Sequence, residues 1–263
     1  MKAPINDGET YYEVHGPEGA PWLTLSHSLA CNVRMWDDQI AAFKDRYRVL
    51  ALDTRGHGQS SAPAGSYTLK GLADDLHGLF AHLGIARTHF VGLSMGGMIG
   101  QTFALRFPGM FASLTLADTT SRYPAEAAEM WAGRIRAARS QGMEPIVRPT
   151  LERWFTEPFR KSRPEVIERV GALIASTPVD GYIGCCHAIS GIGVTARLKE
   201  IACPMLVIVG EQDAATPPAM AREIHANAPG STLVVLPEAA HLSNMEQPLA
   251  FNRALEQFLA PIK

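Results

Sequence analysis

The sequence lacks both a long hydrophobic run and a strong excess of one charge. No apolar stretch approaches the roughly 18 to 20 residues that a membrane helix requires, and the start MKAPIND has no apolar core of a secretory signal. Lysine and arginine total 24 against 26 aspartate and glutamate, a net charge of −2, which gives little attraction to nucleic acid or an anionic membrane. We therefore expect a cytoplasmic protein that acts on a small molecule, with no nucleic acid and no membrane as partner; the sequence sets no oligomeric state.

The few cysteines lack the spacing of a metal or redox site. Cys31, Cys185, Cys186 and Cys203 form no CxxC pair and no Cys/His ligand pattern. Without a secretory signal they are expected to be reduced and buried. We expect no structural disulfide, no metal and no organic cofactor.

Apolar content is high enough for a large core, since 46% of the 263 residues are hydrophobic. Short apolar runs alternate with longer helical patterns, and several runs are apolar throughout, as in parallel strands covered on both faces. This alternation predicts an α/β fold with a mostly parallel central sheet flanked by helices. The expected strands are 10–14, 23–26, 49–52, 89–91, 114–116, 205–209 and 232–236, and the expected helices are 69–83, 98–106, 219–227 and 249–259.

The alternation stops between residues 119 and 192, where no convincing strand is present. This segment has several helix-like patches, which we expect to be broken at the prolines Pro145, Pro149, Pro158, Pro164 and Pro178. We interpret it as a helical cap inserted into the sheet. The predicted domains are a core of residues 1–118 and 193–263 and a cap of residues 119–192.

The segment Gly92-Leu93-Ser94-Met95-Gly96-Gly97 carries the clearest chemical signal. It reads G-x-S-x-G between an expected strand and an expected helix. A serine in such a tight turn needs small neighbours, which Gly92 and Gly96 supply, and the turn would present its hydroxyl outward. Ser94 is therefore the candidate nucleophile, although the short pattern also occurs in structural turns.

A serine nucleophile needs a base that is oriented by a carboxylate. Asp213 follows the expected strand 205–209, and His241 follows the expected strand 232–236. Their placement in the order Ser, Asp, His predicts a catalytic triad of Ser94, Asp213 and His241. Glu211 and Glu238 are nearby acids that compete with Asp213 for the orienting role.

An oxyanion intermediate needs two N–H donors. Met95 directly follows the serine, and Leu29 lies in the loop after the strand 23–26, so their backbone amides are the candidates. The alternative for Leu29 is an ordinary loop. Asp53 and Arg55 follow another strand and are expected to build a supporting polar network.

Together these residues resemble the α/β-hydrolase superfamily, and most closely the 3-oxoadipate enol-lactonases. The resemblance covers nearly the whole chain, cap included. The matching segments are Met35-Trp36, Asp53-Thr54-Arg55-Gly56-His57-Gly58, Gly92 to Gly97, Arg153-Trp154-Phe155-Thr156, Gly181-Tyr182, Ala214-Ala215-Thr216-Pro217 and His241-Leu242-Ser243-Asn244. Two segments depart from the pattern. The chain has His27-Ser28 where much of the superfamily has His-Gly and enol-lactonases more often have Asn-Ser, and Cys185-Cys186-His187 replaces an acidic pattern in the cap.

The resemblance implies a serine hydrolase that opens a carboxylate-bearing enol-lactone to a keto acid through an acyl-enzyme, in aromatic-compound catabolism. A carboxylate on the substrate calls for a cation under the cap. Trp131 and Arg134 lie three residues apart, on one face of an expected helix, where they could hold the ring and the carboxylate. Trp154 and Tyr182 are further candidates for substrate binding. For all four residues, packing within the cap is the alternative.

Two other functions remain open from the sequence. The first is a general carboxylesterase or lactonase paralogue, with or without perhydrolase activity. The second is a ligand-binding receptor on a hydrolase fold, against which the intact set of Ser94, Asp213 and His241 argues. Halide-releasing relatives are disfavoured because they carry an acid at the position of Ser94.

Overall fold

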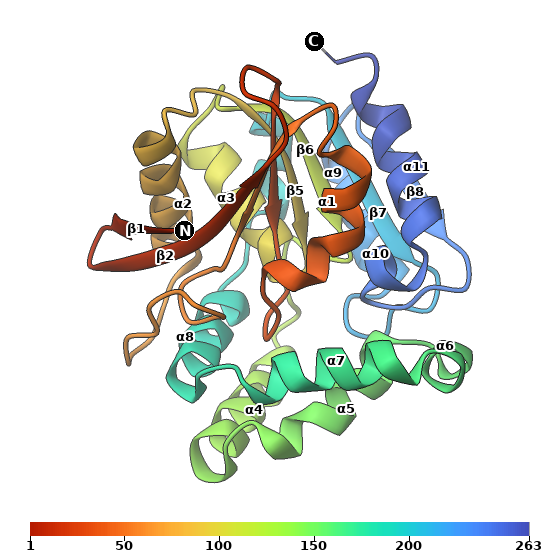
Figure 1. Ribbon diagram of the computed structural model, residues 1–263. Coiled ribbons are helices and arrows are strands. Elements are labelled where there is room, and N and C mark those ends of the chain that lie inside the picture. Colours follow the sequence, from red (N-terminus) through yellow and green to blue (C-terminus); the bar gives the residue numbers. More distant parts are fainter. Residues whose placement is uncertain (263) are drawn as a thin grey trace.

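The computed structural model describes residues 1–262 as an eight-stranded sheet with helices on both faces (Figure 1). The strand order is β1-β2-β4-β3-β5-β6-β7-β8. β1 and β2 form an antiparallel hairpin, β2 pairs antiparallel with β4, and the remaining pairs are parallel. The strands are β1 (Lys2–Ile5), β2 (Gly8–His15), β3 (Trp22–Ser26), β4 (Arg48–Leu52), β5 (Thr88–Leu93), β6 (Phe111–Ala117), β7 (Met205–Gly210) and β8 (Thr232–Leu236).

The central strands are buried on both faces, and their sequences are mostly apolar. Every residue of β5, β6 and β7 is buried, as expected where helices cover both sides of a parallel sheet. α2 (Leu69–Leu83), α3 (Met95–Arg106) and α9 (Pro218–Asn227) contact the sheet on one face, while α1 (Asp37–Phe43) and α11 (Pro248–Leu259) pack together on the other. The carboxyl ends of the parallel strands meet at one edge, where such sheets bind ligands.

Five α-helices between β6 and β7 form a layer across that edge of the sheet, coloured from light green to teal in Figure 1. We name them the cap helices: α4 (Ala127–Gln141), α5 (Glu144–Trp154), α6 (Glu157–Ser162), α7 (Pro164–Ala175) and α8 (Val179–Ser190). Shorter elements are the 3-10 helices η1 (Val33–Trp36) and η2 (Thr195–Glu200) and helix α10 (Ser243–Glu246).

The prolines of the cap agree with the expected breaks at every position except one. Pro145, Pro158 and Pro164 lie in the first turn of their helices, where a missing N–H costs nothing, and Pro178 is the N-cap of α8. The expected break at Pro149 is wrong, because Pro149 lies inside α5. An N–H at this position would have donated to the carbonyl of Pro145, in the first turn of the same helix. Only one helical hydrogen bond, near the helix end, is therefore lost.

The sequence-based fold class is confirmed, and the expected strands and helices are all present. Sequence reasoning missed β1, α1 and α10, which are short, and it began α3 three residues late at Met98. Cys31, Cys185 and Cys186 are buried free thiols, whereas Cys203 is half-buried, contrary to expectation. Within residues 1–262, no helix is both long and apolar enough to cross a membrane.

Candidate active site

Ser94 occupies a sharp turn between β5 and α3. Its backbone has φ 54° and ψ −113°, a left-handed conformation that is unusual for a residue with a side chain. The flanking glycines are required by close backbone contacts: a Cβ on Gly92 would lie 2.3 Å from the Gly96 carbonyl oxygen, and one on Gly96 would lie 2.1 Å from that of Ser26. Close packing thus holds the strained backbone of Ser94 in place. The turn places the serine at the edge of the sheet where the parallel strands have their carboxyl ends.

His241 and Asp213 come together at the same edge, from the loops after β8 and β7. The Nδ1 atom of His241 lies 2.9 Å from Asp213 Oδ2, and both side chains are almost fully buried. The other carboxylate oxygen accepts hydrogen bonds from the backbone N–H groups of Ala215, at 2.7 Å, and Thr216, at 2.9 Å. Glu211 and Glu238 are exposed, so that the acid hydrogen-bonded to the imidazole is Asp213.

Asp213 is held in its charged form. Burial by itself would raise the pKa of this carboxyl, but His241 and the hydrogen bonds from Thr216 outweigh burial and lower the pKa below its usual value. A carboxylate acceptor fixes the proton of a neutral His241 on Nδ1, leaving Nε2 as a base.

A pocket under the cap helices brings these groups together with Ser94. It has a cavity volume of about 70 Å³ and is lined by Ser94, His241, Leu29 and the segment Ala214–Thr216. Among the described residues, the Leu29 amide donates to no acceptor in the chain. Met95 is the first residue of α3, where amides have no partner within the helix. Both amides are thus available to an oxyanion.

The cap side of the pocket carries two arginines and no acid. Trp131, Arg134 and Trp154 line it, as do Tyr123, Met130, Arg153 and Ile189, and no aspartate or glutamate is among the lining residues. The Arg134 guanidinium lies 4.8 Å from the centre of the Trp131 ring, within cation–π range. The Trp154 ring lies 5.9 Å from that of His241. Tyr182 is buried on α8 and does not line the pocket.

Arg153 was missed by the sequence reasoning, although it directly precedes Trp154 in the segment that resembles the enol-lactonases. Its Nε atom is buried and has no hydrogen-bond partner, and the guanidinium forms no ion pair among the described residues. The pocket therefore presents two guanidinium groups to a ligand. Tyr123, Met130 and Ile189 lack a chemical signature that could have placed them there.

A second buried acid, Asp118, directly follows β6 and lies near Asp213. It accepts hydrogen bonds from the Gly210 amide, at 2.8 Å, and from the Ser243 hydroxyl, at 2.5 Å. Burial and the nearby charge of Asp213 raise its pKa well above the usual value. The charged form is therefore costly in the folded state, and the stability of the fold decreases as the pH rises above the ordinary pKa of aspartate.

We predict that Asp118→Asn stabilises the protein at pH 8 and does so much less at pH 5. Asparagine can accept from the Gly210 amide and donate to Ser243, but it has no charge to bury. We expect a Tm increase of about 2–4 °C at pH 8, corresponding to about 1 kcal/mol, measured by calorimetry at both pH values. Asp74→Asn, at an exposed ion pair with Arg106, is the control. An equal Tm difference at both pH values would refute the charge-burial argument.

Comparisons with known proteins identify the family of the chain. A family model described as "alpha/beta hydrolase fold" matches residues 21–248. The chain is an α/β hydrolase. This hydrolase is 41% identical to "3-oxoadipate enol-lactonase 2" of Acinetobacter baylyi over 93% of its own length and 91% of that protein. The crystal structure of the enol-lactonase from Burkholderia xenovorans superposes with a TM-score of 0.95 at 37% identity, covering 99% and 100% of the two chains.

A second solved structure is an esterase. The thermophilic esterase from Thermogutta terrifontis, described as malate-bound, has a TM-score of 0.94 and 32% identity, with 100% of this hydrolase and 99% of that chain covered. Relatives of this hydrolase are thus named as enol-lactonases and as an esterase. The hydrolase belongs to the same enzyme class, the carboxylic-ester hydrolases.

Proposed function

We propose that this hydrolase opens a carboxylate-bearing enol-lactone, 3-oxoadipate enol-lactone, through an acyl-enzyme on Ser94, as a step of aromatic-compound catabolism. The observation that carries the proposal is the composition of the pocket. Arg134 and Arg153 face the same space as Ser94 and His241, and no carboxylate lines it. Such a site favours an ester or lactone that is itself an anion. The names of the relatives at 41% and 37% identity support the same substrate.

The reaction begins with attack of the Ser94 Oγ on the lactone carbonyl. His241 Nε2 accepts the hydroxyl proton, and Asp213 stabilises the imidazolium through Nδ1. The tetrahedral oxyanion accepts hydrogen bonds from the Leu29 and Met95 amides. Its collapse breaks the ring C–O bond, the leaving enol oxygen takes the proton from His241, and the enol converts to the ketone. The ring-opened substrate is now bound to Ser94 as an ester.

Water completes the cycle by the same groups. His241 removes a proton from a water molecule, the resulting nucleophile attacks the ester carbon, and the second oxyanion forms at the same two amides. Collapse returns the proton to Ser94 Oγ and releases the keto acid. No metal or organic cofactor takes part in these steps.

The cap, residues 119–192, supplies the substrate contacts, as a domain inserted into a core of residues 1–118 and 193–263. Arg134 binds the substrate carboxylate, and Trp131 packs against the lactone ring. The Arg134 guanidinium already lies over the Trp131 side chain. Trp154 packs over His241 and shields the base from water. Tyr182 supports the cap side of the pocket without lining it, since it is buried against Arg134 and Cys186.

We predict that Arg134→Ala is selective for the charged substrate. Loss of a charge-assisted hydrogen bond costs about 1.5–3 kcal/mol, so that kcat/KM for the lactone should fall by about 10- to 100-fold. For neutral p-nitrophenyl acetate, kcat/KM should stay within about threefold. Arg136→Ala is the matched control, because Arg136 lies on the same helix with its side chain exposed in an ion pair with Glu129. Equal losses on both substrates would exclude the carboxylate contact.

The lactone assignment is tested with the wild-type enzyme. Ring opening of 3-oxoadipate enol-lactone, measured by absorbance, should show a kcat/KM at least about 100-fold above that for p-nitrophenyl acetate. A lactone value no better than that of the neutral ester would favour the second candidate, a general carboxylesterase or lactonase, which the similarity to the thermophilic esterase supports.

A further inference from the structure

Two histidines outside the triad lie fully buried beside the loop that carries Leu29. His27 and His57 are both 0% exposed, and their rings are 5.1 Å apart. Each imidazole accepts one backbone N–H and has a backbone carbonyl near its other nitrogen. The proton positions on both rings therefore follow from the contacts.

His27 holds the peptide unit that contains the Leu29 amide. Its Nε2 accepts the Thr54 N–H at 2.9 Å, so that Nε2 has no proton and Nδ1 is the donor. Nδ1 lies 2.7 Å from the Ser28 carbonyl oxygen. The Ser28 carbonyl and the Leu29 N–H belong to one planar trans peptide, and they point in opposite directions. Fixing the carbonyl on His27 therefore aims the Leu29 N–H away from His27.

His57 holds the next peptide unit. Its Nε2 accepts the Ala30 N–H at 2.9 Å, and its Nδ1 faces the Arg55 carbonyl, at 3.4 Å, and the Cys185 Sγ, at 4.0 Å. Ala30 has φ 58°, in the left-handed region that favours glycine. An alanine keeps this conformation only where its surroundings impose it. The bond to His57 supplies that constraint on the chain directly after Leu29.

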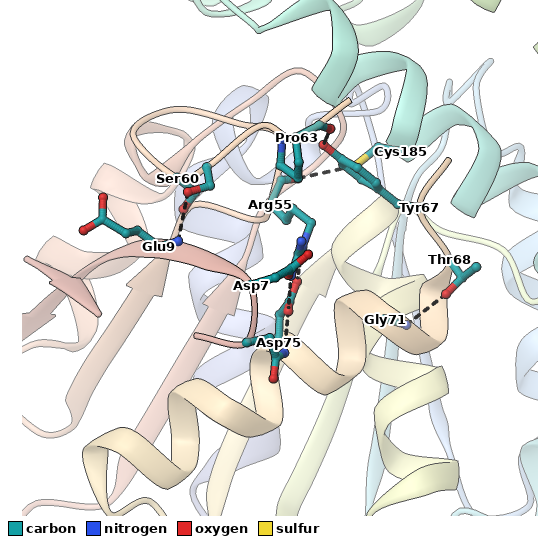
Figure 2. A network of polar contacts seen from close by, with 12 residues as sticks. Asp7, Glu9, Arg55, Ser60, Pro63, Tyr67, Thr68, Gly71, Asp75 and Cys185 are labelled. Atoms are coloured by element: carbon teal, nitrogen blue, oxygen red, sulfur yellow. Dashed lines mark hydrogen bonds and ion pairs between the residues drawn. The ribbon is translucent and has the colours of Figure 1, made fainter. Parts of the chain in front are cut away.

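The loop that carries His57 is itself fixed on several sides. Arg55 lies between Asp7 and Asp75, at 2.6 Å from each, with Cys185 of α8 near its carbonyl, as Figure 2 shows. On the cap side the backbones touch, since a Cβ on Gly181 would lie 2.1 Å from the Gly56 carbonyl oxygen. The position of His57 is therefore set by both the core and α8.

We propose that His27 and His57, each neutral with its proton on Nδ1, are positioning residues that hold the Leu29 amide in the orientation needed by the oxyanion. Neither touches the substrate, and together they fix the peptide planes before and after Leu29. The proposal rests on the proposed function of Leu29 as an oxyanion donor. It also assigns a role to His27-Ser28, a departure from the enol-lactonase pattern.

The surroundings of the two rings keep them neutral. Burial lowers the pKa of His57 to about 3, helped by the neighbouring His27. Burial also lowers the pKa of His27, although the charge of Asp53 acts in the opposite direction. Protonation would replace each acceptor nitrogen by a donor that faces a backbone N–H. A depressed pKa is thus consistent with a loop that keeps its geometry at working pH.

The kinetic test compares two substitutions at residue 57. His57→Leu removes the acceptor, and kcat for p-nitrophenyl acetate should fall at least 30-fold while KM stays within about threefold. His57→Gln can place its amide oxygen near the former Nε2 position, and it should restore kcat to within about fivefold of wild type. His89→Leu is the control, because it removes another buried imidazole. His89 lies in β5, and its Nδ1 atom lies 2.8 Å from the Ser113 hydroxyl. The kcat of this variant should stay within about threefold.

A second measurement on the wild-type protein is independent of activity and of how the variants fold. Nitrogen NMR of ¹⁵N-histidine-labelled enzyme at pH 7.5 should show both rings with Nδ1 protonated and Nε2 unprotonated. A proton on Nε2 of either ring, or a His57→Leu enzyme with unchanged kcat, would overturn the positioning role. If wild type and Ser94→Ala alike hydrolyse no ester, the proposed function fails, and the NMR result still decides the proton positions that the inference requires.

Discussion

Ser94→Ala should lower kcat for ester hydrolysis by about 10⁴-fold or more, with KM for the substrate little changed. Without Oγ there is no acyl-enzyme, and only hydroxide or water activated by His241 can attack. The residual rate reflects that direct attack, together with substrate binding and the oxyanion donors. Hydrolysis of p-nitrophenyl acetate and of the lactone, followed by absorbance at high enzyme concentration, measures the loss.

Ser113→Ala is the matched control for this experiment. Ser113 is buried like Ser94 and lies in the neighbouring strand β6, but its hydroxyl bonds to His89, and neither Ser113 nor His89 lines the pocket. Its activity should stay within about threefold. If Ser94→Ala kept more than a few per cent of the wild-type kcat, the nucleophile would have to be another group.

Asp213→Asn should lower kcat by about 10³- to 10⁴-fold while leaving the fold intact. Asparagine can keep its carbonyl oxygen toward the Ala215 and Thr216 amides, which now bond to the carboxylate. Its NH₂ group then faces His241 Nδ1 and donates to it. This favours the tautomer with the proton on Nε2, which cannot accept the proton of Ser94. Steady-state kinetics and circular dichroism separate the chemical loss from unfolding.

Glu211→Gln and Glu238→Gln are the controls, because these are the acids that competed with Asp213 in the sequence. Both side chains are exposed, and we expect kcat within about twofold of wild type. A large loss in either variant, together with an active Asp213→Asn enzyme, would show that the orienting acid was assigned to the wrong residue.

Much of the site could be predicted from sequence because its signals are local. The glycines around Ser94 are dictated by contacts within one turn and with the adjacent strand, so that the motif reveals the turn. Asp213 and His241 each follow a strongly apolar strand, and the carboxyl ends of parallel strands lie at the same edge. Local sequence and fold class together were enough to predict that Asp213 and His241 meet beside the pocket that Ser94 lines.

The remaining features depend on contacts that no local pattern encodes. His57 bonds to Ala30 and approaches Cys185, residues far from it in the chain, and nothing near His57 in sequence signals either contact. Arg153 is notable because it has no ion-pair partner within residues 1–262, and that can be seen only in three dimensions. Tyr182 and Trp154 were both candidates in the sequence, but only Trp154 lines the pocket, whereas Tyr182 is buried against Arg134 and Cys186.

The most direct test of the central claim is mass spectrometry of the enzyme during turnover. Enzyme and 3-oxoadipate enol-lactone are mixed, quenched in acid after milliseconds and digested. Because ring opening leaves the former leaving group attached, the account predicts an adduct with the full mass of the lactone on the peptide that contains Ser94. An adduct on another residue, or an unmodified Ser94 peptide at every quench time in an enzyme that is turning over, would contradict it.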